Sequence, residues 1–130
     1  LYQFEQRGIE LSRIDCQSEM PTHGHLEIYH QIDISLDVFP FGSGTTAYES
    51  LWMGIPMITK CGPSMLERGA GSLLYHLELF DWITCSEAGY IEAAEEFANQ
   101  IESLGHLRDS LRSKMQSTIG NGLQFTKGLE

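Results

Sequence analysis

The sequence predicts an α/β fold, a parallel Rossmann-like sheet with helices on both faces, for three reasons. Short apolar runs alternate along the chain with stretches of helical pattern, as strands and crossover helices do in βαβ units. The later runs hold almost no polar residue, which is typical of parallel strands buried on both faces. The 130 residues contain no internal repeat or linker, so we expect one domain over residues 1–130.

The first forty residues predict two helices and two strands. Residues 1–7 have the pattern of a helix end with Gly8 as its stop signal, and residues 9–15 form a candidate strand. A polar loop then leads to a short predicted helix over residues 24–31. Residues 32–39 are mostly apolar and too few to favour a helix, so we expect a second strand there.

A loop rich in glycine follows this strand. Gly42-Ser43-Gly44 separates it from a predicted helix over residues 45–53, and Gly54 stands where that helix should end. Residues 56–59 predict the next strand, because they are apolar or β-branched.

The second half repeats the alternation. Ser64 and Glu67 have the spacing of a capping box, which predicts a helix from Ser64 to about residue 77. Ser86 has the place of a second helix cap. The other expected elements are a strand over residues 82–84 and helices over residues 86–102, 104–117 and 121–130.

Charge and cysteine content exclude several classes of protein. Eighteen acidic against eight basic residues give a formal net charge of −10, which argues against a nucleic-acid partner. No apolar stretch approaches the roughly 18 residues of a membrane span, so no membrane partner is expected. The cysteines Cys16, Cys61 and Cys85 lack metal-site spacing and predict reduced thiols in a cytoplasmic protein.

The loop before the helix at Thr45 has the features of an anion site. A helix leaves its first backbone N–H groups unpaired, and its dipole favours negative charge at that end. Glycines let a ligand approach the backbone closely, and the hydroxyls of Thr45 and Thr46 add donors. The loop alone leaves two interpretations open: a diphosphate site, or a plain turn in which Thr45 caps the helix.

A dinucleotide fingerprint is matched only in part. Gly42, Gly44 and Ala47 have its spacing, but the acid expected at the end of the next strand is absent. The nearest acid is Glu49, one turn inside the helix. A non-catalytic nucleotide or NAD(P)-binding module, with Lys60 near a 2′-phosphate, is therefore the alternative function.

Two other motifs, a nucleophile elbow and a histidine metal site, are incomplete in this sequence. Phe41 stands where a nucleophile elbow requires glycine, so Ser43 is not expected to be a nucleophile. His23, His25 and His30 are close in sequence, but no further cluster completes a metal site, and we expect no metal.

The segment "HLEIYHQIDISLDVFPFGSGTTAYESLWMGIPMIT", residues 25–59, resembles the C-terminal catalytic half of the O-GlcNAc transferase family, also called the SPINDLY-like family. Residues 68–74, "RGAGSLL", continue the resemblance. The tail fits as well, with Leu-Arg pairs at 107–108 and 111–112. The resemblance covers most of the chain and is strongest over residues 25–74.

This resemblance implies a role and a reaction. The family is similar to glycosyltransferases with two Rossmann domains, the GT-B class. Its members transfer N-acetylglucosamine from UDP-GlcNAc to Ser or Thr hydroxyls of proteins, with inversion and without a metal or other cofactor. The chain is therefore expected to be the UDP-binding part of such an enzyme, with UDP-GlcNAc as donor substrate.

The resemblance also implies site residues. Thr45 and Thr46 match the two threonines at the diphosphate, Glu49 matches the acid on the ribose hydroxyls, and His25 matches a histidine near the uridine. Gly44 stands beside the diphosphate where animal members have His, which removes one phosphate donor. Arg68 matches a family position, and a structural charge at a helix start is an equal interpretation. No residue stands out as a general base.

The resemblance further implies that much of the enzyme lies outside these residues. The usual sheet order 3-2-1-4-5-6 makes residues 9–15, 32–39, 56–59 and 82–84 strands 3, 4, 5 and 6. Strands 1 and 2, the other Rossmann domain and repeats that bind protein acceptors would belong to other regions. The isolated chain is expected to be inactive and to self-associate through the open edge of strand 4.

Overall fold

A three-stranded parallel sheet forms the centre of the protein. In the computed structural model, which describes residues 1–18 and 21–129, strands β1 (Ser35–Leu36), β2 (Met57–Lys60) and β3 (Ile83–Thr84) lie in the order β1-β2-β3. Ser35 pairs with Met57 and Thr59 pairs with Ile83, both in parallel register. The predicted α/β class is confirmed, and so is the adjacency of predicted strands 4, 5 and 6.

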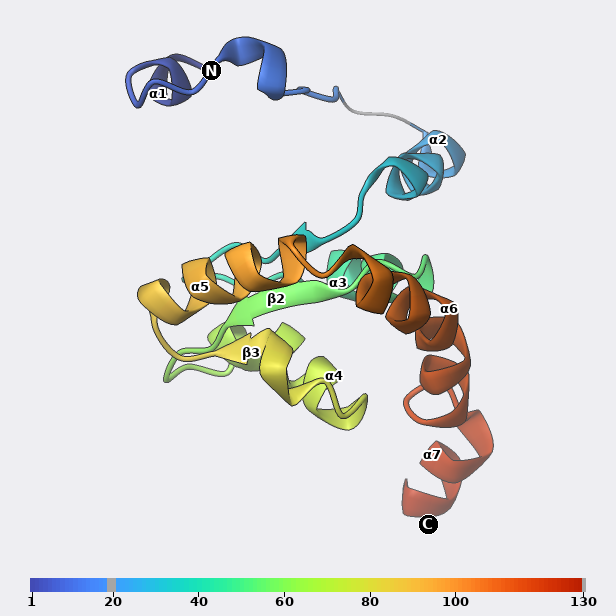
Figure 1. Cartoon of the computed structure of the whole chain (residues 1–130). Coiled ribbons are helices and arrows are strands. Elements are labelled where there is room, and N and C mark those ends of the chain that lie inside the picture. Colours follow the sequence, from blue (N-terminus) through green and yellow to red (C-terminus); the bar gives the residue numbers. More distant parts are fainter. Residues whose placement is uncertain (19–20, 130) are drawn as a thin grey trace.

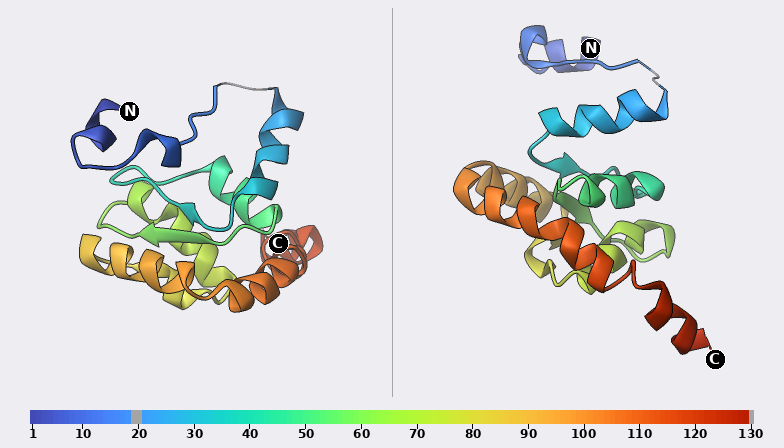
Figure 2. Two further views of the ribbon diagram at one scale, coloured as in Figure 1. Left: turned by 45° about the horizontal axis from the view of Figure 1, so that its top comes forward. Right: turned by 90° about the vertical axis from the view of Figure 1, so that its right-hand side faces the viewer.

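Helices cover both faces of this sheet (Figures 1 and 2). The side chains of Thr59 and Ile83 meet Gly71 of helix α4, whereas Thr84 lies against Gly89 of helix α5 on the opposite face. In the right-hand view of Figure 2, helix α3 lies on the same side of the strands as α4. The main helices are α3 (Thr45–Trp52), α4 (Gly69–His76), α5 (Glu87–Ala98) and α6 (Ile101–Ser117).

The remaining elements are short. The chain begins with α1 (Tyr2–Glu5), η1 (Leu11–Arg13), α2 (Thr22–Ile28) and η2 (Tyr29–Gln31), and it ends with α7 (Gly122–Leu129). Two further 3₁₀ turns, η3 (Leu66–Arg68) and η4 (Phe80–Trp82), precede α4 and β3. No described helix is both long and apolar enough to cross a bilayer.

The core lies between the sheet and its helices. Leu51 of α3, Ile58 of β2, Leu74 of α4 and Leu111 of α6 have no exposed surface. Burying a side chain of this size contributes about 1.5–3 kcal/mol, so these contacts carry much of the stability. They hold the strand ends, and therefore the loops that follow them, in fixed positions.

Two arginines of α6 tie the core to the segments around the site. Arg108 donates to Ile32 O and to Asp33 Oδ1, both at 2.9 Å, just before β1. Arg112 donates to Trp52 O at 3.0 Å and lies 5.3 Å from the Trp52 ring, at the end of α3. These contacts explain the repeated Leu-Arg pattern of the tail. The leucines face the core, and the arginines bind the segment before β1 and the end of α3.

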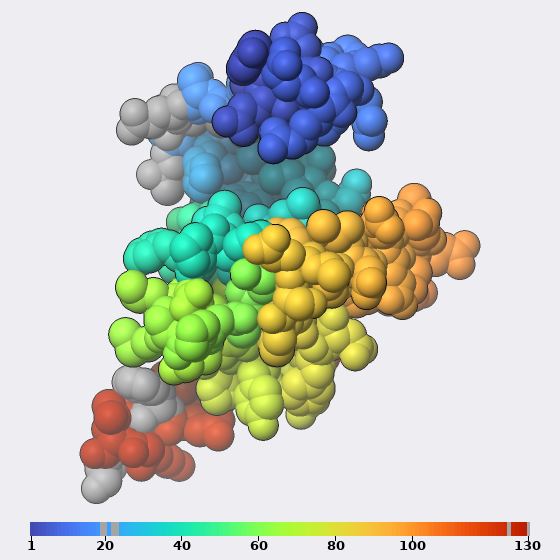
Figure 3. Space-filling view, turned by 90° about the vertical axis from the view of Figure 1, so that its left-hand side faces the viewer, coloured from blue at the N-terminus to red at the C-terminus, as the bar shows by residue number. Residues whose placement is uncertain are grey.

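The predicted strand over residues 9–15 is wrong. The segment contains the 3₁₀ turn η1, and none of its side chains is buried. A strand is stabilised by hydrogen bonds and packing from a neighbouring strand, and this segment has none among the described residues. Figures 1 and 3 show the segment lying outside the α/β part.

Other boundaries differ from expectation. The strand predicted over residues 32–39 is confirmed only for Ser35–Leu36, because its ladder with β2 ends where Asp37 begins the loop. Ser64 and Glu67 do form the capping box, with bonds of 3.0 and 3.3 Å, but the helix they open is divided into η3 and α4. The helix predicted over residues 86–102 ends at Ala98, and Ile101 starts α6. Glu130 of the last predicted helix lies outside the described residues.

Candidate functional site

The carboxyl ends of the three strands lie at one edge of the sheet. The loops that follow β1, β2 and β3 lead into α3, α4 and α5, so three helices begin at this edge. Ligands of open parallel sheets bind beyond this edge. The loop of residues 42–44 is at the same edge, as the sequence predicted.

A buried carboxylate holds this loop in place. Asp37, only 3% exposed, accepts a hydrogen bond from Ser43 N at 2.7 Å and another from Thr59 Oγ1 at 2.6 Å. Its backbone carbonyl accepts from Tyr90 Oη at 2.8 Å. A side chain on Gly42 would approach Asp37 Oδ2 to 3.2 Å, so the glycine allows the loop to fold closely around the carboxylate.

The N-terminus of α3 is open to solvent. Gly44 is its N-cap residue, and no described side chain caps the helix. Thr45 and Thr46 are exposed in the first turn. Thr45 thus lies inside the helix rather than at the cap position, and the plain capping interpretation is wrong for it. The first backbone N–H groups and two hydroxyls are available to an anion.

The start of α4 packs against the same loop. A Cβ on Gly42 would lie 3.3 Å from Leu66 O, and one on Gly69 would lie 3.8 Å from Ser43 O. The loop is therefore fixed from two sides, by Asp37 and by the turn that opens α4. Such a rigid loop can present its backbone N–H groups to a ligand without rearrangement.

His25 and Glu49, which are 24 positions apart in sequence, meet in the fold. His25 Nε2 of α2 lies 3.3 Å from Glu49 Oε2 of α3, and their side chains are 44% and 31% exposed. Glu49 follows Thr45 and Thr46 by four and three positions, so all three lie on one face of α3. The structure therefore brings four of the predicted site residues together.

Tyr29 packs against His25 of the His25–Glu49 pair. Its ring meets the His25 ring edge to face, with centroids 5.5 Å apart, and the residue is 4% exposed. Burial first, and the Glu49 carboxylate second, raise the pKa of Tyr29 above its ordinary value. The phenol stays neutral and acts as a packing surface for the imidazole.

Arg68 and Lys60 have local partners. The Arg68 guanidinium donates to Pro63 O, which fits its structural interpretation at the start of α4. Lys60 Nζ lies 3.9 Å from Glu87 Oε1 and 4.3 Å from the centre of the Phe39 ring, with its side chain 22% exposed. Lys60 is thus engaged in packing the loop after β1.

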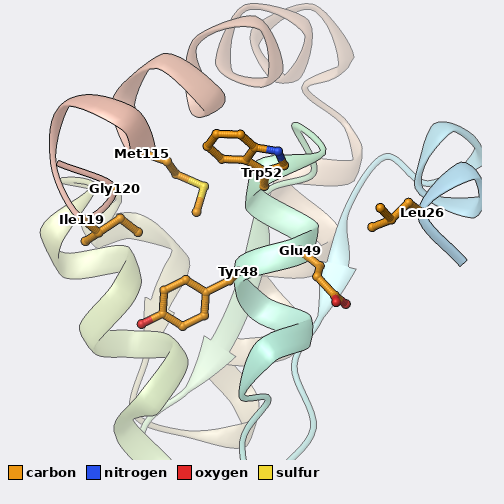
Figure 4. A pocket seen from close by; sticks show the side chains of 7 residues that line it. All are labelled: Leu26, Tyr48, Glu49, Trp52, Met115, Ile119 and Gly120. Atoms are coloured by element: carbon orange, nitrogen blue, oxygen red, sulfur yellow. The ribbon is translucent and has the colours of Figure 1, made fainter. Parts of the chain in front are cut away.

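An apolar pocket of about 380 Å³ adjoins Glu49 (Figure 4). Glu49 points toward the side of α2, which carries Leu26, while Tyr48 points to the other side of α3, where Ile119 lies. The other lining residues are Trp52, Met115, Ile119 and Gly120. A diphosphate needs several hydrogen-bond donors, which the N-terminus of α3 offers. The mostly apolar walls of this pocket suit a diphosphate less well.

The described residues hold no group of three or more His, Cys, Asp or Glu side chains arranged to bind a metal ion. The side chains of Thr22 and His23 lie outside the described part of the chain.

Comparison with known proteins identifies the family. The family model described as glycosyl transferase family 41 matches residues 2–129. The chain belongs to glycosyl transferase family 41. This confirms the resemblance predicted from residues 25–74.

Relatives of this family 41 chain include plant and animal proteins. It is 39% identical over 128 residues to a protein of Petunia hybrida, named probable UDP-N-acetylglucosamine–peptide N-acetylglucosaminyltransferase SPINDLY, and 37% identical to the Arabidopsis thaliana protein of the same name. Each match covers 97% of this chain and 14% of the relative. A Caenorhabditis elegans UDP-N-acetylglucosamine–peptide N-acetylglucosaminyltransferase is 25% identical, with 96% of this chain and 11% of the relative covered.

A solved structure shares the fold. A mutant of the Thermobaculum terrenum O-GlcNAc transferase matches with a TM-score of 0.84 and 34% identity, over 89% of this chain and 22% of that one. This likeness confirms the predicted fold class, the second half of a GT-B C-terminal domain. The family 41 chain spans about a seventh of the length of its plant relatives.

One residue that organises the site was not assigned a role from the sequence. Asp37 directly follows the strand β1 and precedes the glycine loop, and an acid in this place was the available signal in the sequence. Its role depends on Thr59 and Tyr90, which come from β2 and α5. Only the fold shows that these three residues meet.

Proposed function

We propose that this family 41 chain is the UDP-binding part of a protein O-GlcNAc transferase. In this proposal the diphosphate of UDP-GlcNAc binds at the N-terminus of α3, beside Gly44, Thr45 and Thr46. Family membership and the uncapped, solvent-open start of α3 support the assignment. The single observation that carries it is the grouping of Thr45, Thr46 and Glu49 on one helix face with His25 opposite.

The nucleoside would extend from the diphosphate along α3. One helical turn rises about 5.4 Å, so Glu49 lies at the right distance to accept hydrogen bonds from ribose hydroxyls. Glu49 Oε2 lies beside His25 Nε2, and the second carboxylate oxygen could accept from the ribose, since a carboxylate has acceptor sites on both oxygens. His25 would then lie near the uridine.

The reaction would be an inverting transfer of N-acetylglucosamine to a protein Ser or Thr hydroxyl. Negative charge develops on the departing UDP as the bond from the sugar to phosphate breaks. The first N–H groups of α3 and the two threonine hydroxyls would stabilise this charge through fixed dipoles, and their loop is already held by Asp37. This arrangement needs no metal and no other cofactor at the diphosphate.

Groups outside this chain would complete the enzyme. The acceptor hydroxyl must be held in line with the sugar, and no described residue is suited to do so or to act as general base. Protein acceptors would therefore bind through other regions. A cytoplasmic location fits a donor and acceptors of this kind, together with three cysteines that are free thiols in this structure.

The alternative, a non-catalytic NAD(P)-binding module, depended on Lys60. Because Lys60 is engaged by Glu87 and Phe39, it is poorly placed to receive a 2′-phosphate. Calorimetric titration of the protein with UDP, UDP-GlcNAc and NADPH separates the two functions. We expect UDP and UDP-GlcNAc to bind and NADPH to bind at least tenfold more weakly, whereas preference for NADPH would reject the transferase proposal.

A further inference from the structure

We propose that Cys61 and Cys85 form a reversible disulfide, which makes the turns after β2 and β3 a redox-sensitive pair at the edge of the sheet. All three cysteines of the chain are free thiols in this structure. The proposal is independent of nucleotide binding, because it rests on the positions of the two thiols alone.

The strand register places these cysteines opposite each other. Lys60 of β2 pairs with Thr84 of β3, so Cys61 and Cys85 are the next pair along the same two strands. Cys61 N donates to Thr84 O at 2.8 Å, which shows that the strands stay together at this point. Neighbouring strands are about 4.7–4.9 Å apart, within the range of Cα separations that a disulfide requires.

The two side chains also share a face of the sheet. The side chains of Thr59, Cys61 and Ile83 all approach Gly71 of α4, so alternate residues of both strands point to this face. Cys85 follows Ile83 by two positions and takes the same face. Cys85 is exposed and Cys61 is half-buried, so a reagent reaches Cys85 first.

Gly71 keeps space for the Cys61 sulfur. A Cβ on Gly71 would lie closer to Cys61 Sγ than any contact between real atoms allows. The sulfur thus fills the place of a side chain on α4 and is held at the surface of the sheet. A fixed position beside Cys85 favours an intramolecular bond over reaction with a second protein.

The chemistry is thiol–disulfide exchange with a small disulfide such as oxidised glutathione. The Cys85 thiolate attacks one sulfur of the reagent, forms a mixed disulfide and releases one glutathione thiolate. The Cys61 thiolate then attacks the Cys85 sulfur and releases the second glutathione. Two cysteine thiols lose two protons and two electrons, and the small disulfide takes them up as two thiols.

The surroundings of Cys61 slow its attack in the second step. Burial, followed by the neighbouring Cys85 thiol and the Asp37 carboxylate, raises the pKa of Cys61, and Arg68 opposes this effect. A smaller thiolate fraction slows attack on the mixed disulfide. The mixed disulfide on Cys85 should therefore appear first and then decay.

The test uses the protein with Cys16→Ser, which leaves Cys61 and Cys85 as the cysteines of the chain. The protein is equilibrated with glutathione buffers of increasing oxidised fraction, free thiols are alkylated, and the products are measured by intact mass and peptide mapping. We expect a single product with Cys61 joined to Cys85 and no glutathione adduct, at a yield independent of protein concentration. Its melting temperature should be several degrees higher than that of the reduced protein.

Two further variants identify the order of events. Adding Cys61→Ala should trap glutathione on Cys85, and adding Cys85→Ala should slow modification of Cys61 at least tenfold. Circular dichroism of the reduced variants checks that each one is folded. A lasting glutathione adduct on Cys85 in the protein with both cysteines, or a disulfide found only between two copies, would overturn the proposal.

Discussion

The imidazole of His25 and the carboxylate of Glu49 meet at 3.3 Å and join α2 to α3 beside the open end of α3. The contact links a segment that precedes the sheet with the helix that we assign to the nucleotide. It leaves both side chains partly exposed, as groups that contact a ligand must be.

Replacing Glu49 with alanine should weaken UDP binding more than pyrophosphate binding. The carboxylate is assigned to the ribose hydroxyls, which pyrophosphate lacks. Each charge-assisted hydrogen bond contributes roughly 1.5–3 kcal/mol, so UDP affinity should fall by tenfold or more. Calorimetry with both ligands measures the difference, and Glu102→Ala on the exposed start of α6 is the matched control. Equal losses for the two ligands would show that Glu49 acts only through folding.

The double substitution Thr45→Val and Thr46→Val should weaken UDP binding while the fold is retained. Valine keeps the shape of threonine and removes the hydroxyl donors at the start of α3. The expected loss is roughly 1.5–3 kcal/mol for each charge-assisted bond. Thr126→Val in α7, far along the chain from the site, is the control and should bind UDP as the original protein does. Unchanged affinity in the double variant would mean that backbone N–H groups alone hold the anion.

Replacing Asp37 with alanine should reduce both stability and UDP binding. The change leaves Ser43 N–H and the Thr59 hydroxyl without their acceptor, at a cost of about 1–3 kcal/mol for each buried group. Asp37→Asn keeps one side-chain oxygen as acceptor and should cost less. Urea denaturation followed by circular dichroism gives the free energy of unfolding. A stable Asp37→Ala protein with unchanged affinity would show that the loop does not depend on this carboxylate.

The isolated chain should self-associate through β1 and should transfer no sugar. Within residues 1–18 and 21–129, strand β1 pairs with β2 alone, and the exposed side chains of Leu36, Val38 and Phe41 lie in or just after it. An unpaired apolar edge is a template for another strand, and a charged residue on it opposes pairing. Leu36→Lys should therefore reduce association in sedimentation velocity, whereas Leu123→Lys on α7 should not. A strict monomer that transfers labelled sugar would contradict both expectations.

The sequence predicted the elements that depend on local pattern. The capping box of Ser64 and Glu67 and the helix cap at Ser86 are confirmed, because each requires only residues three positions apart. The helix at Thr45 was also predictable, since a glycine loop precedes it and Gly54 ends it with φ of 82°.

Features that depend on distant partners were missed. Residues 9–15 were predicted as a strand, but a strand requires a neighbour, and the described chain gives it none. The roles of Asp37 and of the α6 arginines depend on contacts across 22 to 76 positions. The partnership of His25 with Glu49 was likewise invisible in the sequence, although both residues were expected at the site.

The most direct test of the account is a titration of the ¹⁵N-labelled protein with UDP, followed by amide resonances in two-dimensional NMR spectra. We predict that the largest shifts occur at Gly44, Thr45, Thr46 and Glu49, because the diphosphate contacts the backbone at the start of α3. Met115, Ile119 and Gly120, on the wall of the apolar pocket away from α3, should shift less. Large shifts confined to these three residues, or saturable binding that leaves Gly44, Thr45 and Thr46 unchanged, would contradict the assignment of the nucleotide to this helix.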